Sequence, residues 1–558
     1  MDTLPQDIID EIVFHLVPAD SKPKTPYDVR GRPSLPLAPV AAVSRRLQAA
    51  VERLTFRSIK ITSDELTKFN ELLAPPRRRH LASLTVTILL PPYDDAAARR
   101  AESPEERTVN DESYSLGIAA LFEVLHSWEV EDPETIACRL ALFINHPESP
   151  SDNPWRFNHA PWSDTYPEED GIYEGRYLHS YIQLLDSHAL PTLQRVKQLA
   201  MLRPDDRYGH RNTCPKVPIV LASKMPNLES VKLSMDDDEK RFPDIRVRHR
   251  KEAAEAIGTL SLPALNKADL DFFVRRQKNE RAQPHVLHDP GIPDPLSSVI
   301  CEFSQNLVSL KVSGVFDESL LRPIGRLGST PWPSLRFLDI KLLINTPAGG
   351  WYFTKRDDVP PQPPYTHWSR TNNAHEDLHL EDFSFLEEAA HALLNPVYVF
   401  RGKADDDALA PLVGAYADAL AAMPRLASAA LNFQLEDEVD GEPGWFCVAY
   451  FAPCRSASRH PPRMICPDCN RGVTRQLVTL LLGWEPDEAL AAKLRGIGAS
   501  SARSPWWRRP WPSFSSITRP TSKKIDLMVW LDKDGVSNLQ PLAFSNHAGH
   551  CVGDIRLP

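Results

Sequence analysis

The chain has 558 residues, of which 42% are hydrophobic and 25% are charged; these values are typical of folded proteins and exclude a mainly disordered one. The formal net charge is −10, from 64 basic and 74 acidic side chains, and no long charged tail indicates a surface for nucleic acid or anionic membranes. We therefore expect the partner to be a protein. Proline, with 52 residues, is about twice as frequent as usual, which favours short elements joined by loops.

The sequence indicates a reduced cytoplasmic or nuclear setting. Its first residues, MDTLPQDIIDEIVFHL, are acidic where a secretory signal is basic. No run approaches the roughly 18 apolar residues that are needed to span a bilayer, so no membrane segment is expected. The eight cysteines are dispersed along the chain and do not form the pattern of a disulfide framework.

Two short amphipathic helices are predicted near the N-terminus. Apolar side chains recur at helical spacing from Ile8 to Leu16, and a second such pattern runs from Val40 to Leu54. Between the two patterns, residues 18–39 carry six prolines. Because proline interrupts helices, we expect this stretch to be a loop.

The two helical segments, LPQDIIDEIVFHL and VAAVSRRLQAAVERLTFRSIKI, resemble the F-box in its fungal form. In that family a three-helix module binds the adaptor that links substrate receptors to the cullin scaffold of SCF ubiquitin ligases. The resemblance implies an F-box at residues 1–62, with a proline-rich insertion at 18–39 where the family has only a few residues. A module of this size leaves apolar surface that a partner or the next domain must cover. By resemblance, the adaptor-binding positions are Leu4, Pro5, Ile8, Ile9, Ile12, Val43, Ser44, Arg45, Leu47 and Leu54.

A recurring phrase is the most informative feature beyond residue 62. Most copies begin with Pro-x-Leu, continue with an apolar residue about three positions later, and then alternate between apolar and polar residues. Alternation predicts a strand with one buried face. The copies lie at 78–88, 190–201, 225–235, 262–272, 304–314, 332–342 and 423–433.

The spacing of these copies is typical of a repeat protein. Their leucines, from Leu193 to Leu335, are 28 to 42 residues apart, which resembles leucine-rich repeats of the irregular kind. We therefore expect an α/β fold, a leucine-rich-repeat-like solenoid at 63–345, with helices such as 114–128 and 251–257 between the strands. The alternative is a series of unrelated edge strands in an ordinary α/β domain. Fungal F-box proteins commonly pair the box with such a region, so the two resemblances support each other.

Two long segments, 154–181 and 346–385, are rich in aromatic and acidic residues and are predicted to be loops. A rigid, curved solenoid suits protein recognition, and large aromatic side chains are common anchors in such interfaces. They could equally pack back on the scaffold. The candidate target-binding residues are Trp155, Trp162, Tyr166, Tyr173, Trp351, Tyr352, Tyr365 and Trp368.

Two patterns could bind zinc, but the context of each favours another interpretation. His375, Glu376 and His379 match the H-E-x-x-H motif of zinc proteases, yet the flanking residues are those of a solvated loop or helix end. Cys466 and Cys469 form a C-x-x-C pair, yet the cysteines upstream of them are separated by six residues, too many for a zinc knuckle. No nucleotide-binding or G-x-S-x-G motif is present. We therefore expect no metal and no cofactor.

Residues 386–558 are predicted to form a C-terminal α+β region that caps the solenoid. The run GWFCVAYFAP is typical of a strand that buries its cysteine, helices are expected at 474–482 and 487–495, and a further strand at 524–532. The segment 503–521 mixes arginine, tryptophan and proline. We prefer a flexible loop there over a site that stacks on a nucleic-acid strand.

The sequence thus predicts a non-catalytic adaptor that docks on a ligase adaptor and cullin through its N-terminal helices and holds a protein target through its repeats. One alternative is a zinc-dependent hydrolase that uses His375, Glu376 and His379. Another is an interaction scaffold whose N-terminal helices recruit no ligase.

Overall fold

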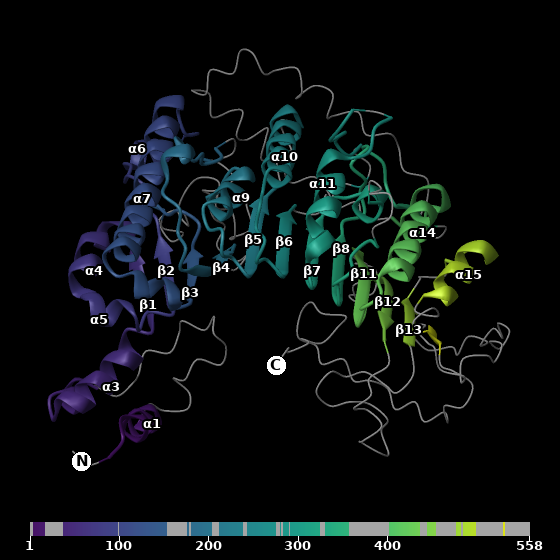
Figure 1. Ribbon diagram of the computed structural model, residues 1–558. Helices are drawn as coiled ribbons and strands as arrows, with labels where there is room; N and C mark the ends of the chain where they lie inside the picture. The colour runs from purple at the N-terminus through teal and green to yellow at the C-terminus, as the bar shows by residue number, and fades with distance from the viewer. Residues whose placement is uncertain are drawn as a thin grey trace, which may run out of the picture. The chain divides into compact units, whose positions relative to one another are not determined.

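The computed structural model describes residues 4–16, 37–98, 100–152, 176–177, 180–203, 211–237, 243–274, 280, 283–289, 291–323, 330–356, 401–435, 444–452, 476–480, 484–497 and 528–530. The fold is mixed α/β, with parallel strands and helices (Figure 1). By its internal contacts the chain divides into two units. The first unit comprises the described residues up to Phe273, and the second unit comprises those from Val274 onward.

The first unit begins with short helices, as predicted, but the second predicted helix is divided. Ser44 has an extended backbone, with φ −158° and ψ 157°, and its Oγ accepts a hydrogen bond from Leu47 N at 3.2 Å. Ser44 is therefore the N-cap of a new helix and ends the pattern that began at Val40. The helices are α1 (Gln6–Leu16), α2 (Ala38–Ala41) and α3 (Arg45–Thr55).

The strands of the first unit lie side by side in chain order and run parallel. Their register aligns apolar side chains in rows: Leu84, Leu142 and Leu199 are successive partners, and all three are fully buried. The row continues through Val231 and Ala268. The strands are β1 (Ser58–Thr62), β2 (Ser83–Thr87), β3 (Leu140–Ile144), β4 (Val196–Met201), β5 (Ser230–Asp236) and β6 (Lys267–Phe273).

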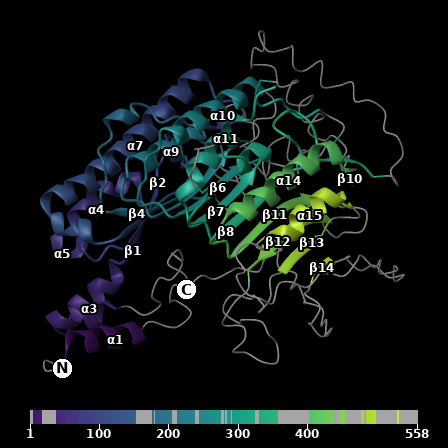
Figure 2. The same cartoon turned by 45° about the vertical axis from the view of Figure 1, so that its right-hand side comes forward.

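Helices connect these strands, and α4, α7, α9 and α10 lie along the same side of the sheet in both views (Figures 1 and 2). The buried rows of the strands face these helices, since parallel strands need crossover connections that cover the sheet. The connecting helices are η2 (Ser63–Glu65), α4 (Leu66–Leu72), α5 (Pro75–Arg78), α6 (Asp95–Ala98), α7 (Pro104–Glu131), η3 (Pro133–Ala137), η5 (Ser187–Ala189), α9 (Lys216–Ser223) and α10 (Pro243–Gly258).

In the second unit β7, β8 and β11 are parallel neighbours, and β12, β13 and β14 continue the sheet in antiparallel pairs. A short antiparallel ribbon pairs β9 with β10. The strands are β7 (Ser309–Gly314), β8 (Phe337–Leu342), β9 (Phe353–Lys355), β10 (Arg401–Ala404), β11 (Ser428–Leu435), β12 (Gly444–Phe451), β13 (Gln476–Leu480) and β14 (Met528–Trp530). The helices are α11 (Pro295–Phe303), η7 (Ser304–Asn306), η8 (Glu318–Leu321), α14 (Asp406–Ala422) and α15 (Glu488–Gly496).

Aromatic side chains form much of the core of the second unit. Phe433 of β11 lies between the rings of Tyr352, Phe353 and Phe446, with ring centroids 5.2 to 5.7 Å apart in edge-to-face geometry. The ring of Trp484 lies 5.8 Å from that of Phe446. Such contacts add to the free energy gained by burying the rings.

Each recurring phrase contains a strand, and each of these strands pairs in parallel with a neighbour, as β2, β4 to β8 and β11. The helices expected at 114–128 and 251–257 lie within α7 and α10, and the helix expected at 487–495 is confirmed as α15. The strand expected at 524–532 is confirmed over its described residues, which form β14. The fold is thus of the α/β class, with parallel strands that extend through β11.

Other elements also differ from the prediction. The helix predicted at 474–482 is wrong: this stretch contains β13, which pairs with β12. Its β-branched Val478 and Thr479 favour a strand once a neighbouring strand offers backbone partners. β1 and β3 were missed, because neither has the Pro-x-Leu start and β1 follows directly on the N-terminal helices.

A buried charged network lies at the start of α7. Glu102 Oε1 pairs with Arg211 Nη2 at 2.5 Å, and Asp111 accepts a hydrogen bond from Gln183 N at 2.8 Å. Burial raises the pKa of Asp111 to about 6, and the nearby Glu102 carboxylate adds to the rise. The Gln183 hydrogen bond and the charges of Arg211 and Arg107 lower the pKa but do not offset burial. An ionised carboxylate in this position therefore weakens the fold.

The stability of the protein is expected to depend on pH through Asp111. Its pKa is raised on folding, so its favourable contribution to stability is complete below the ordinary aspartate pKa of 3.8 and is lost as the pH rises through about 6. Asp111→Asn keeps an oxygen acceptor for Gln183 N and cannot ionise. Urea midpoints measured from pH 4 to pH 7 should fall more steeply for the wild type than for the variant. Parallel curves would contradict this assignment.

Candidate docking surface on the N-terminal helices

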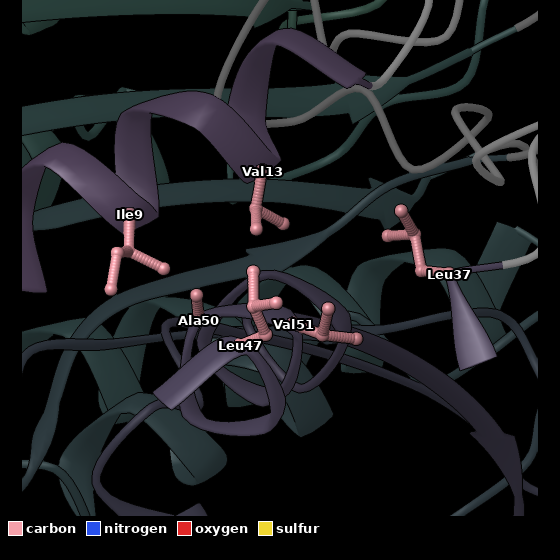
Figure 3. Close-up of a cluster of buried hydrophobic side chains, with 6 residues drawn as sticks. All are labelled: Ile9, Val13, Leu37, Leu47, Ala50 and Val51. Atoms are coloured by element: carbon pink, nitrogen blue, oxygen red, sulfur yellow. The ribbon is translucent and has the colours of Figure 1, made fainter. Parts of the chain in front are cut away.

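A small apolar core holds the N-terminal helices together (Figure 3). Ile9 and Val13 point from α1 toward the apolar face of α3, and each is no more than 2% exposed. Leu37, directly before α2, approaches the same cluster from the side. The buried members on α3 are Leu47, Ala50 and Val51, and partly buried Leu4, Val40, Ala41 and Leu54 pack against them.

Polar contacts fix α1 against α3 beside this core. Gln6 Nε2 donates to Arg46 O at 3.1 Å and to Asp10 Oδ1 at 2.9 Å. The guanidinium of Arg53 pairs with the other oxygen of Asp10. The Gln6–Arg46 and Asp10–Arg53 contacts join residues about 40 positions apart, so they define the angle between the two helices.

The apolar stripe of α1 is wider than the surface that α3 covers. Residues four apart lie in one row along a helix, so Ile9 and Val13 form an inner row and Ile8, Ile12 and Leu16 form an outer row. The inner row is buried, whereas the outer-row side chains are 45%, 38% and 41% exposed. We name these three residues the outer row. It is an apolar surface beside a packed core, which is the arrangement expected of a docking helix.

The predicted adaptor-binding residues therefore fall into different groups. Ile9 and Leu47 form the interior of the module, so their assignment as direct contacts is corrected: they support the surface from within. Ile8, Ile12, Pro5, Val43 and Arg45 are exposed, Ser44 caps α3, and Leu4 and Leu54 pack at the edge of the core.

Sequence reasoning overlooked Leu16 as a surface residue, although its four-residue spacing from Ile12 indicated the outer row. Most of the insertion 18–39 lies outside the described residues. Its last three residues are described: Leu37 lies directly before α2, and residues 38–39 are the first two of that helix.

Of the predicted target-binding residues, two lie in the described part of the chain. Tyr352 is 2% exposed, and its hydroxyl donates to Phe316 O at 2.8 Å. It is a core residue, and its assignment to a binding surface is corrected. Trp351 is partly exposed, with the guanidinium of Arg401 4.4 Å from its ring, and stays a candidate. Outside the described residues lie Trp155, Trp162, Tyr166, Tyr173, Tyr365 and Trp368.

The candidate zinc ligands His375, His379, Cys466 and Cys469 also lie outside the described residues. Cys447, in β12, is buried as predicted. In the part of the chain that the structure describes, no three His, Cys, Asp or Glu side chains are grouped so that they could hold a metal ion. Over the same residues, no helix has the length and apolar composition to cross a bilayer.

No protein-family model matches the sequence, and no curated protein sequence matches it.

Proposed function

We propose that this chain is the substrate-recognition subunit, of F-box type, of an SCF ubiquitin ligase. The observation that carries the proposal is the division of α1 into a buried inner row and an exposed outer row of apolar side chains. Exposed apolar side chains gathered beside a packed core mark a surface that a partner covers. The Leu-Pro start of α1 and the Val-Ser-Arg-Arg-Leu phrase at α3, which resemble the F-box, favour the ligase adaptor as that partner.

We propose further that the strands and helices of residues 63–345 form a leucine-rich-repeat-like solenoid that holds the target. Parallel strands in chain order, most of them from a similar phrase and each followed by a helix or loop, support this assignment. Trp351 is the described aromatic residue that is best placed for a target contact.

The proposed mechanism is proximity. The outer row binds the adaptor, the repeats bind the target, and a separate conjugating enzyme delivers ubiquitin at high effective concentration. No residue of this chain performs covalent chemistry in this scheme. The chain contributes two binding surfaces and the geometry between them.

The proposal is tested with full-length chain immobilised through a C-terminal tag and exposed to purified adaptor and cullin. We expect the wild type to retain both proteins and Ile8→Ala/Ile12→Ala to retain neither. The cullin should bind only when the adaptor is present. If the wild type retains neither protein, the ligase function is rejected and an interaction scaffold without a ligase is the better description.

A further inference from the structure

The connection between α3 and β1 is very short. Only Phe56 and Arg57 separate the end of α3 from the first residue of β1. The carbonyl of Arg57 accepts hydrogen bonds from Ala82 N at 2.9 Å and from Ser83 N at 3.0 Å, which fixes it to the start of β2. Phe56 N donates to Glu52 O at 2.9 Å, so Phe56 is still bound to α3. The connection between the N-terminal helices and the sheet is therefore the Phe56–Arg57 link.

Arg77 of α5 contacts residues on both sides of this short connection. Its Nη2 donates to Glu52 Oε1 at 2.8 Å, and its guanidinium carbon lies 5.0 Å from the centre of the Phe56 ring. Its Nη1 donates to Leu72 O at 3.1 Å, so the same side chain is also tied to the end of α4. The hydrogen bond from Arg77 lowers the pKa of Glu52, which keeps the carboxylate ionised at neutral pH. The Arg77 side chain thus forms hydrogen bonds to α3 and to the end of α4, and its guanidinium packs on the Phe56 ring.

The next two arginines fasten α5 to the rest of the first unit. Arg78 is buried; its Nε donates to Leu73 O at 2.7 Å, and its guanidinium lies 5.0 Å from the Trp128 ring and pairs with Glu131. Arg79 forms a bidentate pair with Asp132, at 2.8 and 3.0 Å. α5 is consequently held against the end of α7 and cannot move with α3 alone.

We propose that Arg77, Arg78 and Arg79 form a joint that fixes the orientation of the N-terminal helices on the first unit, with Arg77 as the positioning residue. Arg78 and Arg79 anchor the joint, and Arg77 closes it on Glu52 and Phe56. The consequence for ubiquitin transfer rests on the proposed function: a fixed joint sets the path from adaptor to target. The joint itself would orient the N-terminal helices whether or not a ligase binds.

The test measures a distance in the full-length chain. Spin labels are introduced through noncanonical amino acids at Asp7 of α1 and Glu123 of α7, both exposed. The wild type should give one narrow distance distribution. Arg77→Glu places like charges at the joint and should broaden the distribution. The exchanged pair Glu52→Arg/Arg77→Glu restores the ion pair but not the contacts of residue 77 with the Phe56 ring and Leu72 O, so it should narrow the distribution in part.

Arg139→Glu is the matched control, because Arg139 is exposed and also pairs with a glutamate, Glu229, and neither residue belongs to α3 or α5. It should leave the distribution unchanged. If circular dichroism shows that Arg77→Glu loses helix, Arg77→Gln replaces it in the same measurement. A narrow distribution in the Arg77 variant, or one in the exchanged pair that is as broad as in Arg77→Glu, overturns the proposal. Adaptor affinity is measured separately and should be the same in all variants, so failure of the ligase function is distinguishable from failure of the joint.

Discussion

Ile12→Asp is expected to abolish capture of the ligase adaptor while the helices stay folded. Ile12 is the middle residue of the outer row, and an aspartate there would bring an unpaired charge into a contact that excludes water. Substitutions at the centre of a small apolar interface commonly cost about 2 kcal/mol or more, which is about thirtyfold in affinity. Titration calorimetry of purified adaptor into wild type and variant measures the difference directly.

Phe14→Asp provides a closely matched control for this experiment. Phe14 lies on the same helix and is 38% exposed, the same fraction as Ile12, but it is outside the outer row. Both variants remove a partly exposed apolar side chain and add one negative charge to α1. We expect Phe14→Asp to bind the adaptor nearly as well as the wild type. Equal losses in the two variants would show that the outer row is not the docking surface.

Asp237→Asn is expected to destabilise the first unit by about 3 to 5 kcal/mol, the usual cost of removing one partner from a buried ion pair. Asp237 follows β5 directly, and its carboxylate accepts hydrogen bonds from Arg246 at 3.0 and 3.1 Å and from Arg250 at 2.6 Å. All three side chains are buried. An amide in place of the carboxylate leaves two arginine charges of α10 uncompensated in the interior. Hydrogen exchange of the β5 and α10 amides in the full-length chain measures the loss.

Lys216→Ala is the control for that measurement. Lys216 of α9 pairs with Glu252 of α10 at 2.8 Å, but both side chains are about one-third exposed. Its loss should cost at most about 1 kcal/mol, because water screens exposed ion pairs. Similar protection in Asp237→Asn and in Lys216→Ala would contradict the assignment of Asp237 as a buried anchor.

Acid should weaken the Asp237 contacts in a predictable direction. Burial alone would raise the pKa of Asp237, but the charges and hydrogen bonds of Arg246 and Arg250 outweigh it and hold the pKa below its ordinary value. The contribution of the ion pair is therefore present above the ordinary pKa of aspartate and is lost as the pH falls through the lower pKa of the folded state. Asp237→Asn should lack this loss of stability in acid.

Many of the parallel strands were predictable, because the signal for a half-buried strand is local. In β6 and β7 alternate side chains are buried, and the same alternation is visible in the sequence. β13 was predicted wrongly for the converse reason. Whether Val478 and Thr479 lie in a helix or a strand depends on β12, which supplies the hydrogen-bond partners from a distant part of the sequence.

At the N-terminal helices, the sequence by itself determined that Ile8, Ile9, Ile12, Val13 and Leu16 share one broad face of α1, because helical spacing fixes which residues are neighbours. Only the tertiary structure decided which of them are buried. Only the inner row is covered, by Leu47, Ala50 and Val51 of α3, which lie about 40 residues further along the chain. The same holds for the joint: three consecutive arginines were visible in the sequence, but their partners Glu52, Glu131 and Asp132 come from different elements. Periodicity is a property of the local chain, whereas burial and pairing depend on which distant segments arrive at the same place.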